Sequence, residues 1–115
     1  MGEIAVDLEI NRTELDGRSI ILLAGEIDAY TVTGLKDMLK SVLETEGKDV
    51  IVDMEQVTYL DSTGLGVFIS ALKTAKEHGR KFELINIQER VYRLFQITGL
   101  IEIMDVKAAI RGGRD

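Results

Sequence analysis

The sequence of 115 residues contains no cysteine and no proline, and its one histidine is His78. Without cysteine the chain can form no disulfide and no cysteine-ligated metal site, and it has no thiolate nucleophile. A single histidine excludes a metal cluster of several histidines and leaves few ways to build a serine–histidine catalytic pair. Because proline is absent, glycine is the main marker of turns and helix ends. We therefore expect no metal and no cofactor.

Basic residues and long hydrophobic runs are also scarce. Fourteen Lys and Arg residues against twenty Asp and Glu residues give a formal net charge of -6. This balance disfavours nucleic acid and anionic membrane surfaces as partners, because both are negatively charged. No apolar run approaches the ~20 residues that a membrane-spanning helix needs. The N-terminus lacks the basic and then apolar pattern of a signal peptide. These absences predict a soluble, cytoplasmic protein with a neutral or basic partner.

The sequence does contain enough apolar residues, 45%, to build the core of one domain of this length. Alternating apolar residues from Ile4 to Ile10 predict a half-buried first strand, and Asp16-Gly17 predicts a hairpin turn after it. Continuous apolar runs predict further strands. We expect them at 19–24, ended by Gly25, at 49–54 with a short extension at 57–60, at 81–87, and as a short closing strand within 100–106.

Apolar residues at spacings of three and four predict three helices, over 31–47, 62–78 and 89–98. A glycine stands at or just after the end of each, where a helix C-cap glycine belongs. The order strand, strand, helix, strand, helix, strand, helix is typical of an α/β fold. We predict a mixed, mostly parallel sheet of four to five strands flanked by helices, with only the first hairpin antiparallel. The tail 110–115 is expected to fray.

The most informative segment is Tyr59-Leu60-Asp61-Ser62-Thr63-Gly64-Leu65-Gly66-Val67-Phe68, where an apolar strand meets a helix. Residue types alone favour a helix cap here, in which a side-chain oxygen accepts a hydrogen bond from a free N–H group and stabilises the helix by ~1 kcal/mol. Gly64 and Gly66 favour a further role, since each glycine in a helix costs ~1 kcal/mol relative to alanine. We interpret both glycines as room for a partner that approaches the backbone closely.

Three blocks of sequence carry a resemblance that covers nearly the whole chain. They are Gly25-Glu26-Ile27-Asp28, Val57-Thr58-Tyr59-Leu60-Asp61-Ser62-Thr63-Gly64-Leu65-Gly66-Val67, and Arg93-Leu94-Phe95-Gln96-Ile97-Thr98-Gly99-Leu100. In their order and spacing they resemble the anti-sigma factor antagonist family, whose fold is the STAS domain. The resemblance implies a single STAS domain over residues 1–115 that is a kinase substrate and not an enzyme. Its implied partners are an anti-sigma factor that is also a serine kinase and a phosphoprotein phosphatase, and we expect a monomer or weak dimer.

By the same resemblance, the unphosphorylated chain binds the anti-sigma kinase and so frees a sigma factor, and phosphorylation of Ser62 ends the binding. Asp61 is expected to cap the helix and orient Ser62, and Asp28 matches a loop at the rim of the site. Thr63 is expected to have a capping or packing role and not to be the modified residue. The predicted partner-binding residues are Asp28, Asp61, Ser62, Thr63, Gly64, Gly66 and Val67, with Ser70 in the same docking patch.

General physical chemistry leads to the same switch. A phosphate adds about -1.5 to -2 charges at pH 7, and a helix N-terminus tolerates an anion, so the domain should stay folded. Docking would then have to remove the phosphate from water beside Asp61 and Asp28, and an unpaired buried charge costs several kcal/mol. Since every ~1.4 kcal/mol is tenfold in affinity, a loss of about a hundredfold or more is expected.

Other activities fit the sequence less well. A serine hydrolase is disfavoured because His78 lies sixteen residues after Ser62, roughly 24 Å along one helix, and because no Gly-x-Ser-x-Gly elbow is present. The chain has no Gly-x4-Gly-Lys-Ser/Thr phosphate loop, although a weaker nucleotide site at Ser62-Thr63-Gly64 stays open. A second hypothesis is a STAS scaffold or sensor module within a larger signalling assembly.

Two sets of charged residues have a second interpretation each. Asp28, Asp53 and Asp61 end predicted strands and could hold Mg2+, but solvated strand ends are the preferred interpretation. Arg90 and Arg93 flank an apolar helix face, which usually means a solvated edge. Their alternative is a phosphate or a carboxylate of a partner.

Overall fold

The computed structural model describes residues 7–109, so strand residues 4–6 and the tail 110–115 of the sequence analysis lie outside the described residues. Five strands alternate with helices in the order expected for the α/β class. The elements are β1 (Leu8–Leu15), β2 (Arg18–Ile27), α1 (Val32–Lys40), the π-helical turn η1 (Ser41–Thr45), β3 (Val50–Leu60), α2 (Ser62–Glu77), β4 (Phe82–Ile87), α3 (Glu89–Ile97), the 3-10 turn η2 (Leu100–Glu102) and β5 (Asp105–Ala108).

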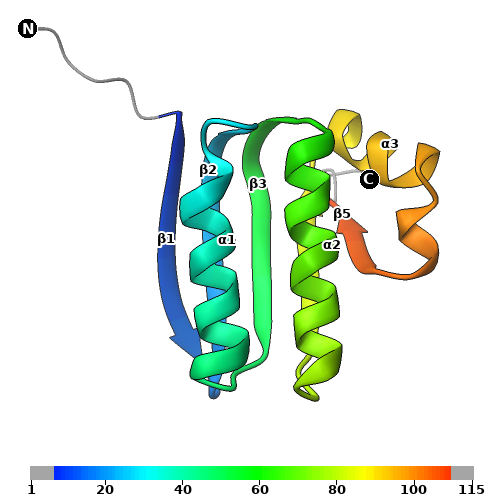
Figure 1. Cartoon of the computed structure of the whole chain (residues 1–115). Helices are drawn as coiled ribbons and strands as arrows, with labels where there is room; N and C mark the ends of the chain where they lie inside the picture. Colours follow the sequence, from blue (N-terminus) through cyan, green and yellow to red (C-terminus); the bar gives the residue numbers. More distant parts are fainter. Residues whose placement is uncertain (1–6, 110–115) are drawn as a thin grey trace, which may run out of the picture.

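The five strands form one sheet in the order β1-β2-β3-β4-β5. β1 pairs with β2 antiparallel, and the other three pairs are parallel, which confirms the predicted mixed sheet. Because each parallel pair is joined by a crossover of the same hand, α1 and α2 pack side by side on one face of the sheet (Figure 1). α3 lies at the β5 side of the sheet (Figure 1), where it contacts β3 and β5.

The core lies between the sheet and the helices. Alternate residues of β2 and β3 point into it, and Phe68 of α2 and Phe95 of α3 are fully buried. The period of two in the strands and of three to four in the helices therefore brings their apolar positions together. No helix within residues 7–109 is long and apolar enough to cross a membrane.

Gly25 does not end its strand, so that prediction was wrong. β2 continues to Ile27, and Gly25 has φ +125° at an irregularity in the pairing with β3. An added Cβ would lie 2.0 Å from the carbonyl oxygen of Asp7, which accepts a hydrogen bond from the Glu26 N–H over 2.8 Å. The glycine thus permits an irregularity where Asp7, the residue before β1, approaches the β2 backbone closely, and the strand continues beyond it.

Two further boundaries differ from the sequence analysis. The predicted extension at 57–60 is part of one continuous strand, β3. The segment 100–106 begins as the turn η2, and β5 starts only at Asp105. Leu100 and Met104 are buried there, and the Met104 N–H donates to the Leu100 carbonyl over 2.9 Å, which folds this segment into a turn. The burial of two apolar residues explains why an apolar run was mistaken for a strand.

A polar cluster joins β1 to the segment that follows η1. It lies at the opposite end of the sheet from the C-terminal ends of the parallel strands. Arg12 pairs with Glu46 and donates to Glu14 over 2.7 Å and to the buried Ser19 hydroxyl over 3.0 Å. Lys48 pairs with Glu14 over 2.9 Å. Hydrogen bonds from Lys48, Ser19 and Arg12 lower the pKa of Glu14 to about 2.

Candidate functional site

The site forms where β2 and β3 end together. The Asp61 N–H donates to the Ile27 carbonyl oxygen over 3.3 Å, which joins the last residue of β2 to the residue after β3. Because parallel strands end at the same edge of a sheet, Asp28 and Asp61 lie on one rim. This is the edge at which α2 begins, at the top of Figure 1.

Asp61 is the N-cap of α2, as predicted. Its backbone is extended, with φ -112° and ψ -173°, and its Oδ1 accepts hydrogen bonds from the Thr63 N–H over 3.0 Å and the Gly64 N–H over 3.1 Å. The carboxylate therefore occupies two of the N–H groups that a helix leaves free in its first turn.

Ser62 is the first residue of α2 and its side chain is exposed. Within the described part of the chain, no hydrogen bond engages its hydroxyl. Since Asp61 supplies the cap, the Ser62 hydroxyl has no structural role in the helix and is accessible from solvent. Thr63 is also exposed, and only its backbone N–H takes part in the cap, so the expected capping or packing role of its side chain was wrong.

Asp28 is held in one orientation by a local turn. Its Oδ1 accepts from the Tyr30 N–H over 2.9 Å and the Thr31 N–H over 3.2 Å, while its own N–H donates to the Thr31 hydroxyl over 2.9 Å. The residue is half-buried. Asp28 therefore shapes the entry into α1 and contributes a fixed negative charge to the rim that carries Asp61.

The two glycines of α2 differ in whether packing within the domain requires them. Gly64 is buried, and an added Cβ would lie 2.3 Å from Leu60 Cδ1 and 2.7 Å from Ile27 Cγ2. Packing within the domain requires this glycine, so its interpretation as room for a partner was wrong. Gly66 is exposed, and an added Cβ would meet nothing within 4 Å. The fold gives no reason for glycine at 66, and close approach of a partner stays a prediction there.

A groove of about 620 Å³ lies between α1 and α2, and its lining includes Thr63, the residue after Ser62. It brings together four residues of the predicted docking patch on α2, although Val67 is only 7% exposed. The sequence analysis missed the opposite wall, which α1 supplies. The lining residues are Val32, Thr33, Lys36, Asp37 and Lys40 from α1 with Thr63, Gly66, Val67 and Ser70 from α2.

The α1 wall carries two lysines that form no ion pair with any residue in 7–109, Lys36 and Lys40. Their spacing of four residues places them on one helix face, and this spacing is visible in the sequence. What the sequence does not give is the packing of α1 against α2 that turns this face toward Gly66. Asp37 lies on the same wall, so the lining of the groove carries two positive charges and one negative charge, in a chain whose net charge is -6.

The remaining sequence candidates lie away from Ser62. His78 follows the last residue of α2, and its Nδ1 lies 3.0 Å from the Thr74 carbonyl oxygen, so it is at the other end of the helix from the serine. Asp53 accepts from the Glu55 N–H over 3.0 Å and from the Asn86 side chain over 3.3 Å. Residues 7–109 contain no group of three or more His, Asp or Glu side chains placed to hold a metal ion.

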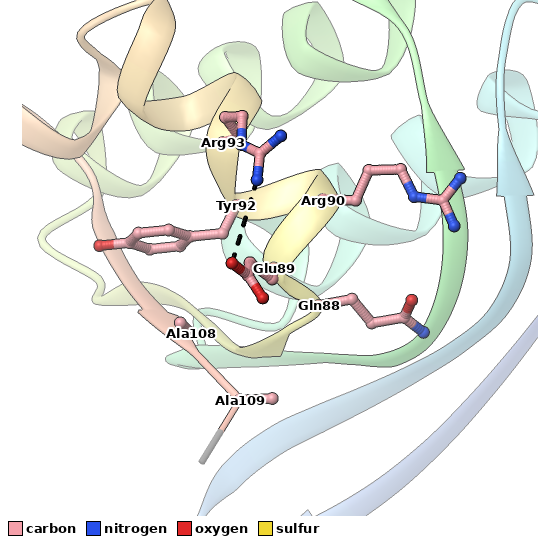
Figure 2. A pocket seen from close by; sticks show the side chains of 7 residues that line it. All are labelled: Gln88, Glu89, Arg90, Tyr92, Arg93, Ala108 and Ala109. Atoms are coloured by element: carbon pink, nitrogen blue, oxygen red, sulfur yellow. Dashed lines mark ion pairs between the residues drawn. The ribbon is translucent and has the colours of Figure 1, made fainter. Parts of the chain in front are cut away.

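Arg90 and Arg93 line a separate pocket of about 640 Å³ at the start of α3, shown in Figure 2. Arg93 pairs with Glu89 over 3.9 Å, and the Arg90 side chain points away from that pair (Figure 2). The pocket also borders Ala108 and Ala109 at the end of β5. Ser62 is not among the residues that line it.

Comparison with known proteins agrees with this architecture. The family model described as the STAS domain matches residues 9–112. The chain is 40% identical over 110 residues to a protein named "Anti-sigma-B factor antagonist" from Bacillus subtilis (strain 168), and the match covers 96% of each chain.

Two solved structures are similar to the fold. One is the anti-sigma factor antagonist SpoIIAA in its unphosphorylated form, with a TM-score of 0.74 and 20% identity over 85% of this chain and 87% of that chain. The other is the Bacillus cell fate determinant SpoIIAA in the phosphorylated form, with a TM-score of 0.69 and 19% identity over 85% of this chain and 90% of that chain. At these identities the two structures show a shared fold.

The five-stranded mixed sheet and the matching family model define a STAS domain. With 40% identity along nearly its whole length to a named member, the chain belongs to the anti-sigma factor antagonist family.

Proposed function

We propose that this protein is an anti-sigma factor antagonist that acts by binding and not by catalysis. Its unphosphorylated form binds an anti-sigma factor that is also a serine kinase and so frees a sigma factor. Phosphorylation of Ser62 by that kinase ends the binding. The observation that carries the proposal is the exposed Ser62 hydroxyl, free of hydrogen bonds within residues 7–109, at the start of a helix that Asp61 already caps.

The proposed contact surface follows from the geometry around Ser62. The kinase covers the serine and the groove beside it, and it approaches the α2 backbone most closely at Gly66, where no side chain intervenes. Val67 contributes the small part of its surface that is exposed, and Thr63 and Ser70 offer hydroxyl groups. Asp28 and Asp61 form the negative rim of this surface. Gly64 contributes indirectly, because it lets α2 pack closely on Ile27.

Phosphorylation changes the surface charge while the fold stays as it is. A phosphate brings about -1.5 to -2 charges, and the positive end of the helix dipole offsets part of their cost. The N–H groups of Thr63 and Gly64, which follow Ser62 in the first turn of α2, are already bonded to Asp61 and are not free to bind the phosphate. We therefore expect the phosphate to stay hydrated beside two fixed carboxylates. A docked kinase would have to strip that water, which costs several kcal/mol for an unpaired charge.

The proposal includes the rest of the system. The whole chain 1–115 forms one STAS domain, located in the cytoplasm, as a monomer or weak dimer. A phosphoprotein phosphatase restores the binding-competent form. No enzymatic activity of the chain is needed, because it is the acceptor of the phosphoryl group.

The test combines phosphosite mapping with binding. Incubation with the cognate kinase and ATP is expected to add one phosphate, located on Ser62 by mass spectrometry, and Ser62→Ala is expected to abolish it while Thr63→Ala does not. In the absence of ATP, Ser62→Ala should bind the kinase as the unmodified protein does, and Ser62→Asp at least about tenfold more weakly. Lys73→Ala is the matched control, because it also makes the net charge one unit more negative at an exposed position of α2.

Equal affinity of Ser62→Ala and Ser62→Asp would contradict the electrostatic switch. No incorporation at Ser62 in the presence of the cognate kinase would contradict the proposed function itself. A stable complex that forms without any modification would favour the scaffold hypothesis instead.

A further inference from the structure

β3 continues well past the end of its partner β4. The two strands pair only from Val50 to Asp53, and within the described chain the segment 56–60 pairs with β2 alone. On the other side of this segment lies α3 rather than a strand, and the Gln88 side chain donates to the Glu55 carbonyl oxygen over 2.7 Å. The C-terminal end of β3, just before Ser62, is therefore bordered by α3 and not by a strand. A space remains between this end of β3 and the helix.

That space is a pocket of about 250 Å³, which we call the β3–α3 pocket. It is lined by Thr58, Tyr59, Leu60, Arg90, Val91 and Leu94. Leu60 and Val91 are buried, at 4% and 3% exposed, and Leu94 is half-buried. Tyr59 is 48% exposed, and one turn beyond Leu94 on the same helix Ile97 is 74% exposed. The pocket thus opens onto an apolar strip on the surface.

Arg90 provides the one charge in the lining of this pocket. It is exposed, and it forms no hydrogen bond or ion pair with any residue in the described range. Figure 2 shows its side chain extended away from the Arg93–Glu89 pair. A guanidinium beside an apolar pocket offers a planar donor for a carboxylate, and nearby apolar surface strengthens such a contact once a partner excludes water.

The position of the pocket relative to Ser62 decides which partner it meets. Leu60 lines the pocket and Ser62 is two residues further on, so their Cα atoms are at most about 7 Å apart. A standard protein interface covers about 800 Å² of each partner, a disc of about 16 Å radius. A protein docked over the Ser62 hydroxyl therefore covers the β3–α3 pocket as well as the groove between α1 and α2.

We propose that the β3–α3 pocket is a second docking point for the kinase that acts on Ser62. It receives an apolar side chain of the kinase, and a carboxylate next to that side chain pairs with Arg90. The inference rests on the proposed function and adds the chemistry of the partner surface. In an acidic chain, an unpaired arginine beside the site favours an acidic group of the partner at that position. The negative rim of Asp28 and Asp61 repels an acidic group of the partner that would dock there instead.

The test is a binding titration with the full-length protein and the cognate kinase. Arg90→Glu is expected to weaken binding at least about tenfold and to flatten its dependence on salt, because it replaces an attractive contact with a repulsive one. Arg93→Glu is the matched control, with the same charge reversal one turn along α3 at a residue outside the pocket lining, and should change affinity less than about threefold. Tyr59→Ala is expected to weaken binding about fivefold or more, with unchanged circular dichroism as the check on folding.

The outcomes separate the two proposals. If the unaltered protein is neither bound nor phosphorylated, the proposed function fails. If it is phosphorylated on Ser62 and Arg90→Glu binds like Arg93→Glu, only the docking point is overturned. Sedimentation of the protein alone addresses a second copy as the occupant, since a dimer that Arg90→Glu dissociates would also overturn the proposal.

Discussion

Gly64 at the start of α2 lies against Ile27 at the end of β2, so closely that an added Cβ would come within 2.7 Å of Ile27 Cγ2 and 3.3 Å of the Ile27 carbonyl oxygen. The same carbonyl oxygen accepts the hydrogen bond from the Asp61 N–H. The absence of a side chain at 64 thus sets how closely the helix that presents Ser62 sits on the sheet.

Gly64→Ala is therefore expected to destabilise the protein by about 1–3 kcal/mol, as overpacking of a filled core does. Urea denaturation gives the free energy of unfolding. Gly66→Ala is the matched control on the same helix, because its Cβ would project into open space. It is expected to stabilise the helix by up to about 1 kcal/mol while weakening kinase binding. Equal losses of stability in the two variants would contradict the separate roles of the two glycines.

Asp61→Ala removes the cap of α2 and is expected to lower the free energy of unfolding by about 0.5–2 kcal/mol. Asp61→Asn keeps a side-chain oxygen for the Thr63 and Gly64 N–H groups and should stay within about 0.5 kcal/mol of the original protein. Because the asparagine has no charge, a phosphate on Ser62 should reduce kinase affinity less in Asp61→Asn. Thermal unfolding measures the stability of the two variants, and kinase binding is compared between the phosphorylated original protein and phosphorylated Asp61→Asn. A loss of stability in Asp61→Asn as large as that in Asp61→Ala would contradict the assignment of Asp61 as the cap.

Gly25→Ala is expected to cost about 2–4 kcal/mol, because it adds backbone strain at φ +125° to a clash with the Asp7 carbonyl oxygen. Gly17→Ala is the comparison, since Gly17 also has positive φ, at +79°, but has open space around its Cβ position. It should cost about 1 kcal/mol. Chemical denaturation of the two variants separates the clash from the strain, and equal costs would argue against a close approach of the Asp7 carbonyl oxygen to Gly25.

Acid is expected to weaken the polar cluster around Arg12. The pKa of Glu14 is lowered from 4.5 to about 2 by Lys48, Ser19 and Arg12, so its contribution to stability is present above the unfolded value of 4.5 and is lost as the pH falls toward 2. The pKa of Glu46 is lowered as well, by its hydrogen bonds with Arg12. The urea midpoint should fall between pH 5 and pH 2.5, and less steeply in Glu14→Gln. Since both carboxylates are accessible to solvent, the effect should be modest.

The sequence was sufficient to predict the α/β order, the antiparallel first hairpin, the start of α2 and the cap at Asp61. These features depend on local signals, namely hydrophobic periodicity and a polar side chain before a helix. The prediction failed where the neighbour comes from a distant part of the chain. Gly25 is explained by Asp7, and Gly64 by Ile27.

The site was predicted only in part for the same reason. Ser62 and Asp61 are adjacent in sequence, and one motif contains both. Lys36 and Lys40 lie at the site only because α1 packs against α2. Arg90 lies near Leu60 only because β3 extends beyond the end of its pairing with β4. No pattern within a single helix or strand contains that information.

The Asp61 cap also bears on how long a modification of Ser62 would last. With the Thr63 and Gly64 N–H groups already bonded to Asp61, these two amides would not shelter a phosphomonoester on Ser62 from an incoming hydrolase. The lifetime of the modified form would then be set by the amount of that hydrolase. Ser62 is thus suited to repeated cycles of phosphoester formation and hydrolysis.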